Sequence, residues 1–260
     1  MSDFVKDFIK ETWEKQAAKY KESHWVSWGD NYAIELEIEN IGVHIRDGNK
    51  VLDVGCANGF ATMRQFRDKK IDITGVDFSD TMIKYAKEQL VDHNISDGIR
   101  FSKGDVRKLE FSDNSFDVTY TTRVLINLPN WEDQMLGINE CLRVTKKGGA
   151  VILSEAFWEP LVLLNALRTL VNLPPLVEHD FNRYLKGKKV DDFLTALDLK
   201  HETVDFSSVY YLGSRFLREL VTEIDKYPGF SNPINGIFYD IEKKYSGGGF
   251  GIQKAVVIKK

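Results

Sequence analysis

The chain has 260 residues, of which 43% are hydrophobic and 28% are charged, and its formal net charge at pH 7 is -4. This composition is typical of an ordinary globular protein. Lys and Arg are interspersed with Asp and Glu, whereas nucleic-acid-binding proteins usually carry a basic stripe or patch, so we expect no nucleic-acid partner.

Cysteine usage and hydropathy exclude further classes. The two cysteines, Cys56 and Cys141, include no CxxC pair, so we expect neither a disulfide framework nor a metal site. The charged amino terminus has no apolar signal-peptide core. The most apolar segment (160–177) is interrupted by polar residues and two prolines, whereas a membrane span needs ~20 largely apolar residues. We therefore expect a cytoplasmic protein with no membrane partner.

The amino-terminal part, residues 1–45, is predicted to be a helical cap. Apolar residues recur four apart in the first twenty positions, which predicts an amphipathic helix. A second helix is expected around Ile34, Ile38 and Ile41, with Asp30 as its cap.

Strand and helix patterns alternate from residue 50 onward. Strands are predicted at 50–54, 71–76, 99–103, 116–121 and 150–155, and helices at 58–68, 80–90 and 131–143. Such alternation predicts βαβ units, and therefore an α/β fold with a parallel sheet covered on both faces.

The alternation becomes irregular after residue 155. An apolar helical insertion is expected over 158–186 with its bend at Pro174 and Pro175, then a helix near 188–198 and a strand near 201–209. A helix over 213–226, a loop and a final strand complete the chain. We expect a single domain over 1–260, in which the insertions 156–187 and 213–250 build a substrate pocket.

The turn after the first strand carries the strongest signal. The run VLDVGCANGF (residues 51–60) places Gly55 and Gly59 after a buried strand, where they allow positive φ and a close backbone approach to a ligand. The dinucleotide pattern GxGxxG fails, because Ala57 and Phe60 stand where glycines would be needed. Asp53, two residues before the first glycine, suits a cationic ligand group.

This run resembles motif I of the class I S-adenosylmethionine (SAM)-dependent methyltransferases. Further stretches are similar to later motifs of that family: Asp77 in ITGVDFS, Asp105 in SKGDVRKLEF, then FDVTYTTRVLINL (116–128) and LRVTKKGGAVIL (142–153). The resemblance spans residues 50 to about 155. It implies a Rossmann-like three-layer sandwich with a mostly parallel seven-stranded sheet whose last strand is antiparallel, with SAM as cofactor and S-adenosylhomocysteine as product.

The resemblance also implies the cofactor-binding residues. Asp77 would accept hydrogen bonds from the ribose hydroxyls, Phe78 and Met82 would pack on adenine, and Asp105 with the Val106 amide would bind the adenine edge. The full expected set is Tyr20, Trp28, Asp53, Gly55, Cys56, Ala57, Gly59, Asp77, Phe78, Met82, Asp105, Val106 and Thr122.

Missing motifs indicate a small methyl acceptor. The (D/N/S)PP(Y/F) motif of DNA amino-methylating enzymes and the paired glutamates of protein-arginine enzymes are absent. We expect transfer to O or N of a small molecule, with anionic or nucleotide-activated metabolites among the candidates. Later stretches are similar to a bacterial group associated with surface-polysaccharide (capsule) modification.

Three residues are catalytic candidates. His179 is the predicted general base, because its pKa suits proton transfer near neutrality. Arg123 is expected either to bind an acceptor anion or to pair with Glu155. Tyr20 would exclude water and attract the sulfonium through its ring.

Two other function classes stay open. A nicotinamide oxidoreductase on the same fold is disfavoured by the glycine spacing, and the YxxxK pair Tyr239 and Lys243 lies too near the carboxyl terminus to be the dehydrogenase dyad. A non-catalytic SAM-binding regulator is the other. A monomer or a homodimer is expected.

Overall fold

The computed structural model describes residues 29–222, 229 and 232–260. The expected first helix, Tyr20 and Trp28 lie outside the described residues, as does the end of the helix expected over 213–226.

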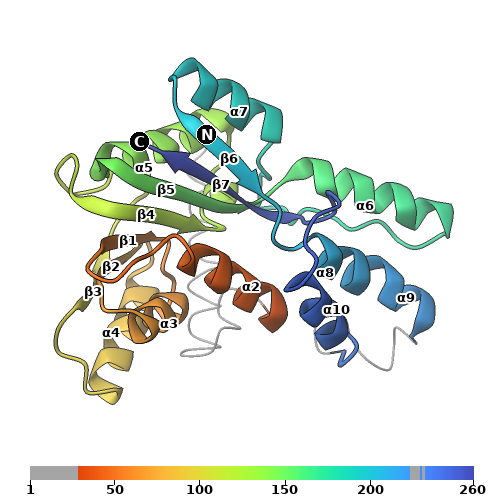
Figure 1. The fold of residues 1–260 in the computed structure, drawn as a ribbon, viewed down its shortest axis with the longest axis horizontal. Helices are drawn as coiled ribbons and strands as arrows, with labels where there is room; N and C mark the ends of the chain where they lie inside the picture. Colours follow the sequence, from red (N-terminus) through yellow and green to blue (C-terminus); the bar gives the residue numbers. More distant parts are fainter. Residues whose placement is uncertain (1–28, 223–228, 230–231) are drawn as a thin grey trace.

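A seven-stranded sheet forms the centre of the described structure, with the strand order β3-β2-β1-β4-β5-β7-β6 (Figure 1). Strand β7 is antiparallel to both of its neighbours, β5 and β6, and the other pairings are parallel. This arrangement confirms the fold class expected from the sequence. The strands are β1 (Lys50–Val54), β2 (Asp72–Asp77), β3 (Ile99–Lys103), β4 (Phe116–Thr122), β5 (Thr145–Ala156), β6 (Lys200–Val204) and β7 (Gln253–Lys259).

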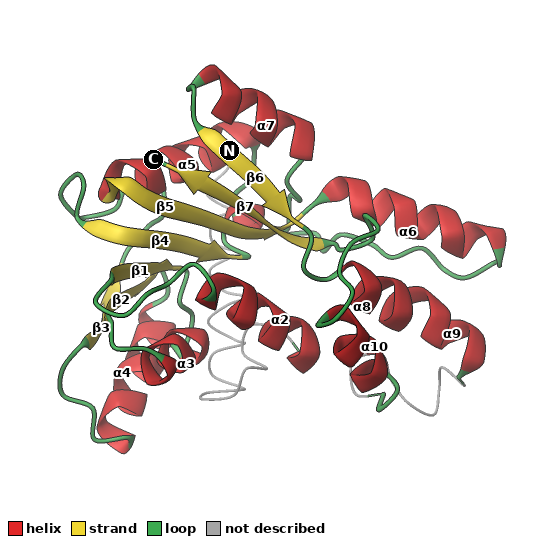
Figure 2. Ribbon diagram, in the orientation of Figure 1, coloured by secondary structure: helices red, strands yellow, loops and turns green. Residues whose placement is uncertain are grey.

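Helices lie on both faces of the sheet. Figure 2 shows α2 (Asn31–Gly42), α3 (Phe60–Asp68) and α4 (Asp80–Asp92) on one side, and α5 (Trp131–Val144) and α7 (Gly187–Ala196) on the other. A short 3-10 helix, η2 (Leu125–Asn127), follows β4. The three layers leave the carboxyl ends of the central strands as the place where loops from different units meet.

Side-chain caps explain where the first helices begin. The Asp30 carboxylate accepts a hydrogen bond from the Ala33 amide at 3.2 Å, as expected from the sequence, and so caps α2. The Ser79 hydroxyl accepts from the Met82 amide at 3.2 Å and caps α4. The second cap starts a helix directly after the end of β2.

The first insertion is helical only in its first half. Helix α6 covers Trp158–Leu170, and residues 171–186 return without regular helix, so the expectation of a helical insertion over 158–186 is wrong beyond Leu170. The return segment is bonded back to the helix: Arg168 donates to the Pro174 carbonyl at 2.7 Å, and Asn165 bonds the Leu176 backbone in both directions. These side chains supply the hydrogen bonds that a continued helix would have made.

The region before the last strand also differs from expectation. Strand β6 ends at Val204, not near 209, because helix α8 (Ser208–Leu212) takes up the end of the expected strand. Helix α8 continues into the π-helical turn η3 (Gly213–Leu217) and α9 (Arg218–Val221). The predicted loop contains a helix, α10 (Asn235–Glu242). In Figure 1 these helices and α6 group beyond the end of the sheet.

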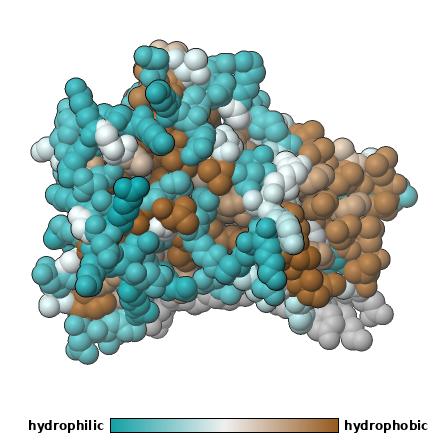
Figure 3. All heavy atoms as spheres, in the orientation of Figure 1, coloured by the Kyte–Doolittle hydropathy of each residue, from teal (hydrophilic) through white to brown (hydrophobic). Residues whose placement is uncertain are grey.

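Apolar side chains gather on the surface of that helical group (Figure 3). Leu170, Val221 and Ile237 are 80%, 70% and 58% exposed. No helix within the described parts of the chain is both long enough and apolar enough to cross a bilayer.

Candidate active site

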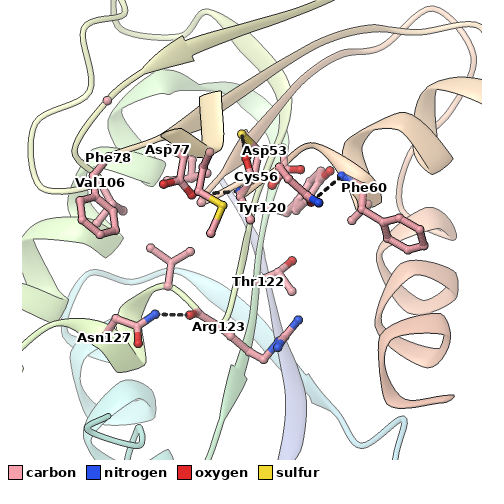
Figure 4. Close-up of a pocket in the computed structure, with 18 of the residues that line it drawn as sticks. Asp53, Cys56, Phe60, Asp77, Phe78, Val106, Tyr120, Thr122, Arg123 and Asn127 are labelled. Atoms are coloured by element: carbon pink, nitrogen blue, oxygen red, sulfur yellow. Dashed lines mark hydrogen bonds between the residues drawn. The ribbon is translucent and has the colours of Figure 1, made fainter. Parts of the chain in front are cut away.

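A cavity of about 310 Å³ opens at the carboxyl ends of β1, β2 and β4. Its described walls come from α2, the loop after β1, the loops after β2 and β3, the end of β4, and η2 with the residues that follow it. It contains these residues expected from the sequence: Asp53, Gly55, Cys56, Ala57, Asp77, Phe78, Met82, Asp105, Val106, Thr122 and Arg123. Figure 4 shows Asp77, Phe78 and Val106 on one side and Thr122, Arg123 and Asn127 on another.

The loop after β1 has the left-handed backbone that its glycines predict. Gly55 and Gly59 have φ values of +82° and +81°, and Ala57 between them has +47°. A Cβ on Gly55 would lie 1.9 Å from the Val124 side chain, so this position has no room for one. Gly59 is the N-cap of α3 and is not among the residues that line the cavity. The loop therefore packs its backbone closely against the turn after β4.

Asp77 holds this loop in place. One oxygen of its carboxylate accepts from the Ala57 amide at 2.9 Å, and the other accepts from the Ser79 amide at 2.9 Å. The side chain is buried yet lines the cavity. A carboxylate oxygen can accept more than one hydrogen bond, so an acid at this edge of the cavity suits a ligand that donates hydrogen bonds.

Asp53 is the most buried of the three acids. It is 1% exposed, and the Thr62 hydroxyl donates to it at 2.6 Å. Burial raises the pKa of Asp53 to about 7, although the hydrogen bond from Thr62 opposes the shift. A cationic ligand group beside Asp53 would restore its charge.

Asp105 is held by an ion pair. Its carboxylate accepts from the Arg107 guanidinium at 2.5 Å and from the Arg107 amide at 2.9 Å, and Arg107 also pairs with Asp133 at 3.2 Å. Met82, 1% exposed, and Val106, 6% exposed, lie in the same apolar wall as the half-exposed Phe78. This side of the cavity is shaped to accept a flat apolar group with a polar edge.

Arg123 pairs with Glu37, not with Glu155. Its Nε lies 3.3 Å from the Glu37 carboxylate, and its φ of +54° places it in the left-handed region. Glu155 accepts instead from the Thr121 hydroxyl at 2.7 Å and from backbone amides, including that of Val124 at 3.1 Å. The expected Arg123–Glu155 pair is thus wrong, because the turn after β4 already occupies Glu155.

Glu37 is a site residue that the sequence pattern did not reveal. It is 1% exposed and lines the cavity from α2. Burial raises its pKa to about 7, while the charge of Arg123 opposes that shift. Its position in the helical repeat could have predicted its burial. Position 37 follows Ile34 by three residues and precedes Ile41 by four, so Glu37 lies on the apolar face of the helix.

The structure does not bring His179 to the cavity. The residue is exposed in the return segment after α6, where its ring stacks on Phe181 with centroids 5.5 Å apart. No described residue of 156–187 or 213–250 lines the cavity. The general base assigned to His179 and the pocket role of both insertions stay predictions.

The YxxxK pair has a structural explanation. The Tyr239 hydroxyl and the Lys243 ammonium both donate to Glu39, at 2.9 and 2.8 Å. They join α10 to α2 and are not among the cavity residues.

Comparisons with known proteins agree with this fold. A family model described as "Methyltransferase domain" matches residues 45–206. The ubiquinone/menaquinone biosynthesis C-methyltransferase UbiE of Azotobacter vinelandii is 32% identical over 56% of this chain and 58% of its own length. The 27-O-demethylrifamycin SV methyltransferase of Amycolatopsis mediterranei is 28% identical over 45% of this chain and 42% of its own length.

A solved structure shows the same fold at lower identity. The geranyl diphosphate C-methyltransferase of Streptomyces coelicolor A3(2), in complex with Mg²⁺, geranyl diphosphate and S-adenosyl-L-homocysteine, superposes with a TM-score of 0.57 at 17% identity. The match covers 86% of this chain and 77% of that one.

The fold and the ordered acids of the cavity define a class I SAM-dependent methyltransferase domain. The family model covers more than half of the residues, so the chain belongs to this methyltransferase family. The matched part spans little more than half the length of the first relative.

Proposed function

We propose that this chain binds SAM in the cavity and transfers its methyl group to a small molecule. The observation that carries the proposal is the set of three acids, Asp53, Asp77 and Asp105, around one cavity at the ends of successive strands. An acid at the end of each of three strands suits a ligand with a cationic end, a ribose and a base.

Each part of the cavity fits one part of this cofactor. Asp77, which the Ala57 and Ser79 amides hold in place, accepts hydrogen bonds from the ribose hydroxyls. Phe78 and Val106 pack on the adenine ring, with Asp105 at its edge. The contacts expected from Cys56, Met82, Tyr20 and Trp28 belong to the same proposal, whereas Gly59 does not line the cavity and the Thr122 hydroxyl is assigned to the acceptor.

The amino-acid end of the cofactor is bound by the loop after β1. Gly55 lets the backbone approach closely, because a Cβ there would meet Val124. Asp53 faces the ammonium group, and that positive charge favours the ionised form of a carboxyl whose pKa burial has raised to about 7.

The chain contributes positioning and the exclusion of water. Bound SAM supplies an electrophilic methyl group on its sulfonium. Holding a nucleophile in line with that methyl supplies much of the rate acceleration. A base is needed only where the acceptor loses a proton.

The acceptor is proposed to be a small organic molecule. The relatives' names refer to quinone biosynthesis and to a demethylrifamycin, and the solved neighbour holds geranyl diphosphate. The pairing of Arg123 with Glu37 offsets the charge that was expected to bind an anion. No relative named here acts on a polysaccharide precursor, so the capsule assignment has no support. A cytoplasmic location and a monomeric or homodimeric state stay predictions.

Calorimetry with SAM, S-adenosylhomocysteine and NAD tests the cofactor assignment. We expect both sulfur compounds to bind with 1:1 stoichiometry and NAD to give no heat of binding. Binding of NAD alone would favour the oxidoreductase class. Binding of SAM without methyl transfer to any member of a broad acceptor panel would favour a non-catalytic SAM-binding protein.

A further inference from the structure

Four buried oxygen atoms on residues that line the cavity have no hydrogen-bond partner among the described residues. They are Glu37 Oε1, Tyr120 Oη, Thr122 Oγ1 and Asn127 Oδ1. More than about nine in ten buried polar groups in native proteins are hydrogen-bonded. Four such atoms in one cavity indicate a ligand that supplies the missing hydrogen bonds, and the Glu37 and Asn127 oxygens in particular need donors.

The orientation of these groups is fixed by the residues around them. The Asn127 amide nitrogen donates to the Arg123 carbonyl at 2.8 Å, which leaves Oδ1 as the unpaired end of that side chain (Figure 4). The Arg123 amide is bonded to the Ser154 carbonyl at 2.9 Å, so the turn after β4 is pinned to β5. The polar end of the cavity is therefore preorganised for a ligand.

The charge of this end is already balanced. When Glu37 is ionised, its carboxylate beside the Arg123 guanidinium balances that charge, so neither an anion nor a cation is needed to neutralise it. The unpaired carboxylate and amide oxygens accept hydrogen bonds, and a ligand O–H or N–H can donate to them. A phosphate or carboxylate group offers acceptors instead, and would leave them unsatisfied.

The walls near this polar end are apolar. Ile34 and Ile38 come from the same helix as Glu37, and Leu128 and Pro129 directly follow Asn127. Ligand sites commonly combine such apolar walls with a few polar groups that fix the orientation of the ligand.

We propose that Glu37, Thr122 and Asn127 form the acceptor subsite, that it binds an apolar skeleton carrying a hydroxyl group, and that Glu37 takes the proton of that hydroxyl. This inference rests on the proposed methyl transfer. The acceptor oxygen forms a bond to the methyl carbon, and the carbon–sulfur bond breaks with its electron pair remaining on sulfur. The hydroxyl proton moves to the Glu37 carboxylate, so atoms and charges balance.

The surroundings of Glu37 suit this role near neutral pH. Burial raises its pKa to about 7, Arg123 opposes the shift, and Glu155 on β5 and Asp30 before α2 raise it further. A base works best when its pKa lies near the operating pH.

Three probes with one skeleton test the subsite: 2-naphthol, 2-methylnaphthalene and 2-naphthyl phosphate, each titrated into protein loaded with S-adenosylhomocysteine. We expect 2-naphthol to bind about tenfold or more tightly than either of the others, because it alone donates to the unpaired oxygens. Equal affinity for 2-naphthol and 2-methylnaphthalene, or preference for the phosphate, would overturn the subsite.

The variants Glu37→Gln and Glu37→Ala test the proton role. In the wild type we expect 2-naphthol affinity to rise between pH 5.5 and 8, with a midpoint near 7, as Glu37 ionises. Glu37→Gln should bind 2-naphthol with no such dependence, and Glu37→Ala should lose about tenfold in affinity at pH 8. A pH dependence retained in Glu37→Gln would overturn the assignment of Glu37 as proton acceptor.

Glu35→Gln is the matched control. Glu35 lies on the same helix but bonds Arg64, away from the cavity, so this variant should keep the wild-type pH dependence. All variants should bind S-adenosylhomocysteine within about twofold of wild type. If the wild type did not bind S-adenosylhomocysteine, the proposed function would be refuted. If it bound S-adenosylhomocysteine but did not prefer 2-naphthol to the other two probes, the subsite alone would be refuted.

Discussion

Asp77 shows how one side chain serves both the fold and the site. Its carboxylate accepts one hydrogen bond from the Ala57 amide, in the loop after β1, and one from the Ser79 amide, at the start of α4. Because it joins two loops that line the cavity, its replacement affects the shape of the loops as well as any direct contact with the ligand.

We expect Asp77→Ala to weaken SAM binding by at least tenfold, since each lost charge-assisted hydrogen bond is worth ~1.5–3 kcal/mol. Calorimetry against wild type measures the change. Asp72→Ala, at the opposite end of β2 and paired on the surface with Arg100, is the control and should bind normally. Unchanged affinity in Asp77→Ala would contradict the ribose assignment.

Asp53 predicts a pH dependence of stability. Its folded pKa of about 7 lies above the ordinary value of 3.8, so the folded state holds the proton more tightly than the unfolded state. The contribution of Asp53 to the free energy of unfolding is therefore complete below about pH 4, and it is lost as the pH rises through 7.

Asp53→Asn should remove this loss while still accepting from Thr62. Three pKa units correspond to about 4 kcal/mol, so we expect the variant to gain about 2–4 kcal/mol relative to wild type on going from pH 4.5 to pH 8. Urea unfolding at both pH values measures the difference. If the free energy of unfolding changed by the same amount in both proteins between these pH values, Asp53 would not titrate in this range.

At the scale of elements, the loop after β1 packs against the turn after β4. Gly55 and Val124 face each other there, and Glu155 on β5 holds the Val124 amide. This contact positions the two halves of the cavity relative to each other.

Gly55→Ala should lower the free energy of unfolding by about 1–3 kcal/mol and abolish tight SAM binding, because a Cβ meets Val124 and φ is +82°. The double variant Gly55→Ala/Val124→Ala should recover part of the stability, since the contact is relieved and the backbone strain is not. Chemical denaturation of both variants measures this; equal stability of the two would mean that the clash is unimportant.

At the scale of the whole molecule, two contacts tie α2 to the helices near the carboxyl terminus. Asp30 is fully buried, bonds the Tyr210 hydroxyl at 2.5 Å and pairs with Arg215. Glu39 makes the second contact, with Tyr239 and Lys243, and that pair is largely exposed.

These contacts should differ greatly in their effect on stability. Asp30→Ala leaves Arg215 buried without its carboxylate, and we expect a loss of about 3–5 kcal/mol. Lys243→Ala removes an exposed pair, for which we expect less than about 1 kcal/mol and no change in SAM affinity. Thermal and urea unfolding of both variants measure the contrast. A large loss of SAM affinity in Lys243→Ala would mean that the YxxxK pair contributes to the site after all.

Local patterns and motifs are enough to predict the sheet and to bring together most of the residues of the proposed cofactor site. The run from Val51 to Gly59, the acids Asp77 and Asp105, and the alternation of strands and helices are contiguous features, and the carboxyl ends of parallel strands meet at one edge of a sheet. The strand-to-loop transitions are therefore sufficient to predict that these residues lie together. The helix after Leu170 is overestimated because apolar periodicity does not show where side chains such as Arg168 replace backbone hydrogen bonds.

The proposed acceptor side of the cavity depends on tertiary structure. Glu37 and Arg123 lie 86 positions apart in the numbering, on segments that no local pattern connects, and only folding brings Nε to 3.3 Å from the carboxylate. Burial then sets the ionisation of Glu37, and His179, a sound choice by residue type, lies on the surface. From the sequence, local periodicity predicts the alternating strands and helices, and the resemblance of the motifs implies the antiparallel last strand and the proposed cofactor-binding edge. The partners and protonation of the acceptor end depend on long-range packing, which a linear pattern does not contain.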